Sequence, residues 1–366
     1  NVYAVGTFTI PLMKSNGYEP HQAAGIEATA SCGGQIMPPV MGAGAFVMAE
    51  FLGITYTEIM VRAIIPAILY YLAVFASVHF MSKRMGMKKG LAVKYPRGLA
   101  RRLYMLAPLI ILVIVLMTGA SSLLAAYYGC VSAFVIGTLR ILEGRLSTTF
   151  TGERVRFKDL FESLSLGGIW LVSMALACAA AGVIVGVLSM TGLGMSFVGI
   201  LISTAGNSMW LIAFFVMIAC MILGMGMPTT TAYILAAAFA GPALTKCGVP
   251  PLVTHFFIFY FAVFANITPP VAVASYAAAQ VAQTGIMPTS WVAIRVGISA
   301  MIIPYMFLAD PALLGIGSPL NIVVDFGTAV IGAVILSGGI FGWFHKRLNK
   351  AEQVLFTIVG LLFIYP

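Results

Sequence analysis

Long apolar segments alternate with short polar ones along most of the chain, and the apolar segments are long enough to be membrane helices. Residues 166–190 form a run of 25 positions without a charge, whereas a helix needs about 20 apolar residues to cross the hydrocarbon core. The ten-residue alternating segments of a transmembrane β-barrel are not found along the chain. The pattern therefore predicts an all-α polytopic membrane protein.

Two of the apolar segments are interrupted near their middle. Residues 22–52 contain the motif SCGGQIMPP, and residues 253–283 contain the motif FANITPP. Proline and glycine are poorly tolerated inside helices, so each segment predicts a discontinuous helix. A third segment, residues 209–244, has two short apolar runs separated by GMGMPTTT, which we interpret as a re-entrant hairpin.

The prolines and glycines of the first half recur in the second half. The offset is 231 residues for the first pairs and two residues more for the last one. Such a coincidence indicates two repeats with the same helix breaks, and chance similarity between apolar sequences explains it poorly. The matching pairs are Pro11 with Pro242, Gly17 with Gly248, Pro20 with Pro251, Pro38 with Pro269, Pro39 with Pro270, and Arg62 with Arg295.

Basic loops predict the orientation of these repeats. Residues 82–102 hold eight Lys or Arg and no acid, which places them in the cytoplasm. Crossings at 104–117 and 122–142 then return the chain to a second charged stretch on the same side. Counting on in this way, four full crossings separate the two discontinuous helices. An even number means that the helices run in opposite directions, so the repeats are inverted.

These boundaries divide the chain into five segments, and both of its ends lie inside apolar stretches. We therefore expect it to be a truncated fragment of a longer protein. The segments are a first inverted repeat at 1–80 (the second arm of a hairpin, a broken helix and the following helix), a basic cytoplasmic loop at 81–102, scaffold helices with an interfacial arm helix (157–166) at 103–207, a second inverted repeat at 208–310 (hairpin, broken helix and following helix), and a C-terminal transmembrane extension at 311–366.

Composition and charge narrow the function. The chain is 61% apolar and 8% charged, against about 25% charged residues in an ordinary soluble domain. The net charge of +9 comes from the loops between apolar segments, where membrane orientation explains it, so we expect a lipid bilayer and no nucleic acid as partner. Neither HExxH, nor GxSxG, nor a pair of intramembrane carboxylates is present, and the protein is not expected to be an enzyme.

The two breaks and the hairpin tip are the candidate binding site. Irregular backbone at membrane depth is tolerated only beside protein or a polar cavity. Carbonyls freed by the prolines, together with hydroxyls, suit a hard cation such as Na⁺. Half-helix N-termini suit a carboxylate. The candidate substrate-binding residues are Ser31, Gly33, Gly34, Thr229, Asn266 and Thr268, and the candidate Na⁺ ligands are Ser31, Cys32, Gly224, Gly226, Thr230, Thr231 and Thr268.

Four weaker interpretations stay open beside this one. The breaks can also serve only to shape helix packing. Glu27 can accept a proton or pair with a cation, but an acid so near the start of its helix is expected to be solvated. His255 can titrate, yet it lies near the outer end of a half-helix. The five cysteines, Cys32 among them, stand singly and have the character of small core residues.

Two long blocks carry a resemblance to a known family. Residues 6–53 read GTFTIPLMKSNGYEPHQAAGIEATASCGGQIMPPVMGAGAFVMAEFLG, and residues 224–282 run from GMGMPTTTAYIL through FANITPP to AAAQVA. With the helices between them, the match covers about residues 1–310. The chain resembles the large membrane subunit of the tripartite ATP-independent periplasmic (TRAP) transporters, and especially members in which the small and large subunits are fused.

The resemblance implies an elevator-type transporter of the bacterial inner membrane that imports small carboxylates, with Na⁺ as the coupling ion and no organic cofactor. It also implies two partners: a periplasmic substrate-binding protein, usually of the TAXI type in fused members, and a small four-helix membrane subunit fused upstream. The family's first hairpin tip would precede Asn1. The alternatives are a one-component carboxylate symporter and an ion channel, although inverted repeats favour alternating access over a channel.

Overall fold

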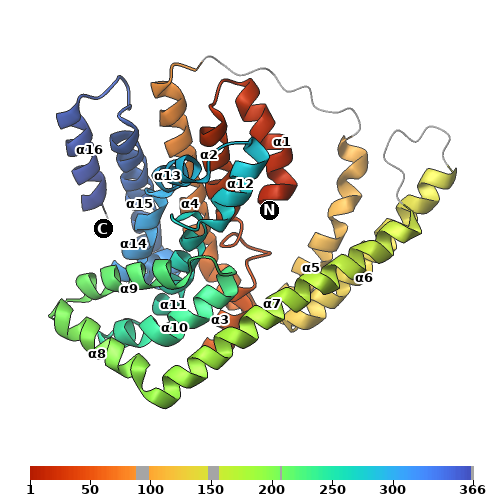
Figure 1. Cartoon of the computed structure of the whole chain (residues 1–366), viewed down its shortest axis with the longest axis horizontal. Helices are drawn as coiled ribbons and strands as arrows, with labels where there is room; N and C mark the ends of the chain where they lie inside the picture. Colours follow the sequence, from red (N-terminus) through yellow and green to blue (C-terminus); the bar gives the residue numbers. More distant parts are fainter. Residues whose placement is uncertain (88–98, 147–155, 207, 364–366) are drawn as a thin grey trace.

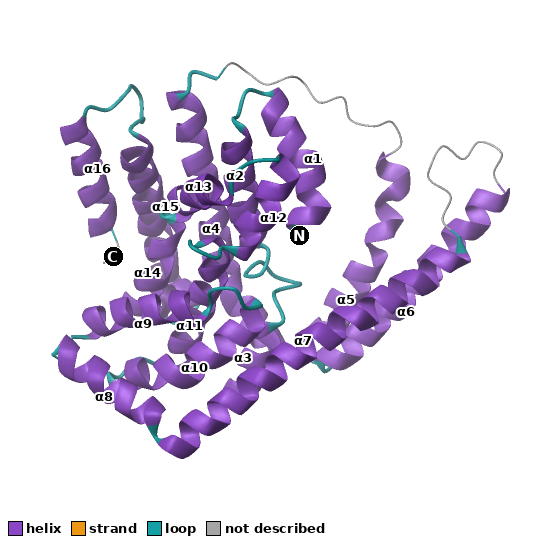
Figure 2. Ribbon diagram, in the orientation of Figure 1, coloured by secondary structure: helices purple, strands orange, loops and turns teal. Residues whose placement is uncertain are grey.

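The computed structural model describes residues 1–87, 99–146, 156–206 and 208–363, and these residues form helices without strands (Figures 1 and 2). Three of the described helices are long and apolar enough to cross a membrane, or up to five if each of two bent pairs is one span. The prediction of an all-α polytopic membrane protein is confirmed. The greater part of the predicted basic loop lies outside the described residues.

The first repeat has the predicted break. Helix α1 (Val2–Ser15) is followed by α2 (Pro20–Gly33) and α3 (Gly44–Leu52). Helix α2 begins at Pro20, where a missing amide hydrogen costs nothing. It ends where the amide of Gly34 donates to the Ser31 carbonyl at 3.3 Å. This bond joins residues three apart, as in a 3₁₀ turn, whereas an α-helix joins residues four apart. The ten residues between α2 and α3 form the first break.

The second repeat has the same plan. The hairpin consists of α9 (Met209–Leu223) and α10 (Thr229–Lys246), and the broken helix consists of α11 (Pro251–Phe264), the short η2 (Ala265–Ile267) and α12 (Val273–Ala282). Helix α11 is apolar all round because it runs through the centre, where every residue from Phe256 to Phe264 is buried.

Structure and packing agree with the predicted correspondence of the repeats. Gly17 and Gly248 both have positive φ, +102° and +86°, and Pro20 and Pro251 are both first residues of helices. Helix α1 packs against α2 and α12, whereas α10 packs against α11 and α3. Each hairpin arm therefore contacts the first half of its own broken helix and the second half of the other broken helix.

Further helices, long and short, surround this centre. They are α4 (Tyr56–Arg84), the bent pair of α13 (Ile286–Gly297) with η3 (Ala300–Ile302) and α14 (Ile303–Ala309), then η4 (Pro311–Leu314), α15 (Pro319–Phe341) and α16 (Lys350–Leu362). Helix α15 packs against α4 and α16. A buried hydroxyl chain joins three of these segments, since Ser337 Oγ lies 3.2 Å from Ser77 Oγ and donates to Ser299 Oγ at 2.8 Å.

The predicted repeat partners Arg62 and Arg295 both bind helix-end carbonyls. Arg62 donates to the Gly315 carbonyl at 2.7 Å, just after η4. Arg295 donates to the Ile340 carbonyl at 3.0 Å, in the last turn of α15. Such carbonyls have no partner within their own helix and carry a partial negative charge. The two arginines therefore fix the C-terminal segments to the repeats at both ends of α15.

The remaining helices form an arm. They are η1 (Leu99–Leu106), α5 (Ala107–Met117), α6 (Ser122–Leu146), α7 (Phe157–Thr191) and α8 (Leu193–Ala205), of which α7 and α8 pack against α10. Helices α5, α6 and the first part of α7 extend away from the centre, while α8 lies beside α9 and α10 (Figure 1). Here the structure differs from the prediction of a separate interfacial helix. Residues 157–166 are the first turns of the continuous α7. Phe157, Phe161 and Leu164 on their apolar face stay exposed, although the Phe161 ring centroid lies 6.3 Å from that of Phe134 in α6.

Candidate functional site

The two breaks meet at a cavity of about 200 Å³ between α1, the end of α2, η2 and the start of α12. Three residues predicted from the sequence lie in its wall, namely Ser31, Cys32 and Asn266. The sequence did not single out the polar residues Asn1, Tyr3 and Gln35, although Gln35 stood inside the first motif. The remaining wall consists of Val2, Val273, Ala274 and Ala277.

Two helix ends of opposite polarity face this cavity. Ser31 and Cys32 belong to the last turn of α2, and Val273 and Ala274 belong to the first turn of α12. The C-terminal end of a helix carries a partial negative charge and the N-terminal end a partial positive one. The α2 side of the cavity therefore suits a cation, and the α12 side, with its free amide hydrogens, suits a carboxylate.

Tyrosines of α4 take up the backbone carbonyls at the end of α2. Tyr70 Oη donates to the Thr29 carbonyl at 2.7 Å, and Tyr71 Oη donates to the Ala30 carbonyl at 3.2 Å. Sequence reasoning treated freed carbonyls as cation ligands and missed these tyrosines, because their helix is distant along the chain. Two backbone carbonyls near the end of α2 are therefore already hydrogen-bonded to side chains of α4.

A third tyrosine holds the first break in shape. Tyr56 Oη donates to the Pro39 carbonyl at 2.9 Å and accepts from the Met41 amide at 3.2 Å. One hydroxyl thus satisfies a donor and an acceptor that the helix interruption leaves without helical partners.

Glu27 is buried, with 5% of its surface exposed, so the expectation of a solvated acid is wrong. Its Oε1 accepts from Ser31 Oγ at 2.8 Å, and its Oε2 accepts from Thr9 Oγ1 of α1 at 2.5 Å. The burial comes from α1, which crosses α2 closely at Gly6. A Cβ added to Gly6 would lie 3.2 Å from Glu27 Cγ. This neighbour could not be read from the sequence of α2.

Asn266 joins the second break to the hairpin tip. Its Nδ2 donates to Thr229 Oγ1 at 2.9 Å, and also to the carbonyls of Ala262 at 3.3 Å and Val263 at 3.2 Å. The side-chain amide nitrogen is therefore fully used, and the carbonyl oxygen is left to accept from, or coordinate, whatever occupies the cavity. The hairpin tip and the second break, both predicted to belong to the binding site, are therefore in direct contact.

The other candidate hydroxyls lie behind the cavity wall. Thr268 Oγ1 donates to the Phe264 carbonyl at 2.9 Å. Thr230 and Thr231 are 5% and 4% exposed, and Thr231 Oγ1 finds no hydrogen-bond partner within the described part of the chain. The backbone of Thr230 lies beside Gly44, the first residue of α3, with 3.7 Å between its Cα and a Cβ built on that glycine. The hairpin tip thus contacts the second break and the residue that directly follows the first.

The glycines among the candidate site residues lie where a larger side chain would clash or where the backbone has positive φ. A Cβ on Gly33 would lie 2.4 Å from Tyr70 Cε1, and one on Gly224 would lie 2.6 Å from the Ala265 Cβ. Gly34 is beside the cavity, where a Cβ would lie 2.8 Å from Asn1 Nδ2. Gly226 has φ +76° at the hairpin tip, a backbone conformation that other residues rarely adopt.

His255 lies outside the cavity wall, where its Nδ1 pairs with Tyr233 Oη at 2.6 Å. Tyr233 belongs to α10 and His255 to α11, so this bond ties the second hairpin to its broken helix. The Thr9–Glu27 bond makes the corresponding connection between α1 and α2. A hairpin arm is thus tied to its broken helix by a polar contact in both repeats.

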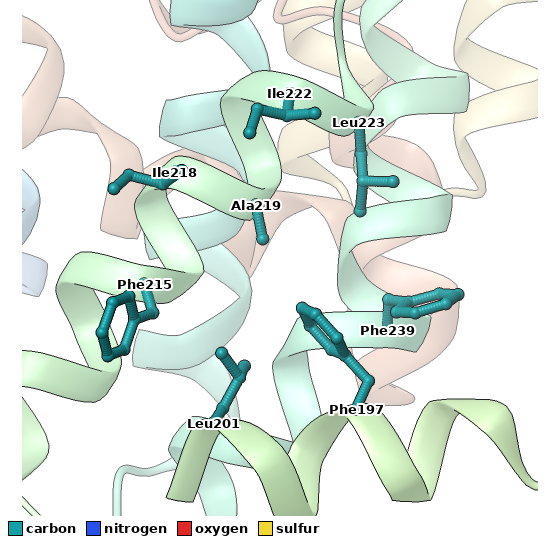
Figure 3. Close-up of a pocket in the computed structure, with 8 residues that line it drawn as sticks. All are labelled: Phe197, Leu201, Phe215, Ile218, Ala219, Ile222, Leu223 and Phe239. Atoms are coloured by element: carbon teal, nitrogen blue, oxygen red, sulfur yellow. The ribbon is translucent and has the colours of Figure 1, made fainter. Parts of the chain in front are cut away.

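A larger cavity of about 310 Å³ lies between α8, α9 and α10 (Figure 3). Its wall consists of hydrocarbon side chains only: Phe197, Leu201, Phe215, Ile218, Ala219, Ile222, Leu223 and Phe239. Such a wall offers neither ligands for an ion nor donors for a carboxylate. The smaller polar cavity is therefore the candidate functional site.

Two comparisons with known proteins bear on this site. The family model described as "Tripartite ATP-independent periplasmic transporter, DctM component" matches residues 1–322, which include both breaks and the hairpin. A search of curated proteins finds no match.

Proposed function

The chain belongs to the DctM component family of the tripartite ATP-independent periplasmic transporters, and from that premise we propose that it imports small carboxylates together with Na⁺ across the bacterial inner membrane. The family makes it a membrane permease component that works with a periplasmic binding protein and a small membrane subunit. The finer assignments, namely Na⁺, the carboxylate, a binding protein of the TAXI type and a fused small subunit, are part of the proposal.

One observation carries the proposal: a small cavity at the meeting point of two helix breaks has opposite helix ends on its two sides. The cation binds on the α2 side, with Ser31 Oγ and Asn266 Oδ1 as oxygen ligands. The carboxylate binds on the α12 side, at the free amide hydrogens of the first turn. A cation and an anion bound side by side stabilise each other, and this mutual stabilisation couples substrate binding to Na⁺ binding.

Alternating access follows from the two hairpin arms. Helix α1 and the α9–α10 hairpin each contact both broken helices. The two broken helices, α1 and the hairpin therefore form one packed unit around the cavity. We propose that this unit moves against the arm of α5 to α8 as an elevator, carrying substrate and ion between the two sides. Chemical transformation of the substrate is not part of this cycle, and the protein acts as a transporter, not an enzyme.

Uptake by the complete transporter in proteoliposomes tests this function. We expect uptake of a radiolabelled carboxylate, chosen by its binding to the cognate soluble protein, to require that protein, the small subunit and an inward Na⁺ gradient together. A K⁺ gradient of the same size is the control. The rate should saturate with both substrate-loaded binding protein and Na⁺.

Each alternative predicts a different result. Robust Na⁺-driven uptake without the binding protein would identify a one-component symporter. Flux that neither saturates nor responds to the Na⁺ gradient would identify a channel. Uptake that needs the binding protein but is indifferent to Na⁺ would refute the ion assignment alone.

A further inference from the structure

We propose that Glu27 is a positioning residue that fixes the hydroxyl hydrogen of Ser31 and so turns Ser31 Oγ into an acceptor-only ligand for the coupling cation. The inference rests on the proposed function, because it takes the cavity as the Na⁺ site. It assigns a role to a buried acid that lies outside the cavity wall and that the mechanism above does not use.

The direction of the hydrogen bond is the first step. Ser31 follows Glu27 by one helical turn, and Ser31 Oγ donates to Glu27 Oε1 at 2.8 Å. An ionised carboxylate only accepts hydrogen bonds, so Ser31 has to donate its single hydrogen to it. The lone pairs of Ser31 Oγ then remain for the cavity. A hydroxyl held in this way coordinates a cation well and cannot donate to a carboxylate substrate.

The charge of Glu27 is the second step. Its other oxygen, Oε2, also accepts a hydrogen, from Thr9 Oγ1, so both carboxylate oxygens have a hydroxyl partner. None of the ion pairs among the described residues includes Glu27, although it is 5% exposed. A buried charge without a counter-charge is costly. A cation bound at Ser31, one side chain away, supplies that counter-charge, so the same carboxylate both orients the ligand and attracts the ion.

The thread from Thr9 through Glu27 to Ser31 also joins α1 to the cavity. Thr9 lies in the hairpin arm, and Glu27 and Ser31 lie in the broken helix. Thr9 holds only the far oxygen of the carboxylate, so its hydroxyl should matter less for the cation than that of Ser31. This difference provides a matched control within one hydrogen-bond network.

The test is Glu27→Gln in the complete transporter. Glutamine keeps the size of the side chain but removes the charge and introduces an N–H donor, which reverses one of the two hydrogen bonds. We expect the half-saturating Na⁺ concentration to rise about tenfold or more, while the KM for substrate-loaded binding protein at saturating Na⁺ stays within about twofold. Thr9→Val should move the half-saturating Na⁺ concentration far less.

A double-mutant cycle separates positioning from a general structural effect. If Glu27 acts through Ser31, Glu27→Gln should add little in a Ser31→Ala background, whereas independent effects would multiply. Unchanged Na⁺ activation in Glu27→Gln, or multiplying effects, would overturn the proposal. If instead Ser31→Ala leaves Na⁺ activation unchanged, the cavity is not the cation site, and the fault lies in the proposed function.

A binding measurement covers the case in which Glu27→Gln is too unstable to transport. The increase in the melting temperature of the purified protein with added Na⁺, compared with K⁺, reports ion binding without turnover. Glu27→Asp keeps the charge but shortens the reach to Ser31, so its Na⁺ response should fall between wild type and Glu27→Gln. A Na⁺ response equal to wild type in both variants would refute the role of Glu27.

Discussion

The contact between the hairpin tip and the second break provides the sharpest test of the site. Thr229→Val keeps the shape of the side chain and removes the oxygen that accepts from Asn266 Nδ2 at 2.9 Å. Asn266 then keeps only its two longer bonds, to the carbonyls of Ala262 and Val263 at 3.3 and 3.2 Å. The amide is then held by these longer bonds alone, so its carbonyl oxygen is less firmly directed into the cavity.

The size of the effect follows from the strength of one such bond. Polar contacts between membrane helices contribute about 0.6 kcal/mol on average and about 1.7 kcal/mol at most. If that stabilisation is lost only in the ion-bound state, the half-saturating Na⁺ concentration should rise by about threefold to about twentyfold, since about 1.4 kcal/mol corresponds to a factor of ten. Both side chains are 9% exposed, so water can replace the lost bond only in part.

The assay is the initial rate of substrate uptake as a function of Na⁺ concentration in proteoliposomes of equal transporter content. Thr245→Val is the matched control, because Thr245 lies in the same helix and its hydroxyl binds only carbonyls of its own helix, those of Gly241 and Pro242. Equal Na⁺ activation in wild type, Thr229→Val and Thr245→Val would refute the assignment of Asn266 as a cation ligand. A lower melting temperature in Thr229→Val without a change in Na⁺ activation would show that the contact is only structural.

Two further predictions concern packing and orientation. Gly33→Ala should lower the melting temperature in detergent by several degrees, because its Cβ would lie 2.4 Å from the Tyr70 ring and such overpacking costs about 1–3 kcal/mol. Gly182→Ala is the control and should leave the melting temperature unchanged, because Gly182 in α7 has open space around it. Equal melting temperatures in the two variants would contradict the packing described here. Inverted repeats place Lys14 in the cytoplasm and Lys246 in the periplasm, so an impermeant thiol reagent added to intact cells should label a cysteine introduced at Lys246 and not one introduced at Lys14. Equal labelling would exclude the inversion.

The sequence by itself determined the class of the protein and the places where its helices break. These properties are local, because a proline lacks its amide hydrogen and a positive φ favours glycine whatever the surroundings. The pairs Gly17 with Gly248 and Pro20 with Pro251 predicted that the same breaks occur twice, and in the structure both glycines have positive φ and both prolines begin helices. The sequence did not predict that residues 157–166 continue without interruption into the crossing at 166–190 as the single helix α7.

Tertiary structure alone decided how the site is built. Tyr70 and Tyr71 reach the end of α2 from 41 residues away, and Glu27 is buried because Gly6 lets another helix approach it. Nothing in the local sequence of α2 distinguishes an acid exposed at the membrane surface from one enclosed by a crossing helix. Burial and hydrogen-bond direction depend on which segments meet across the fold, and these decide whether Ser31 faces the cavity as a donor or as an acceptor.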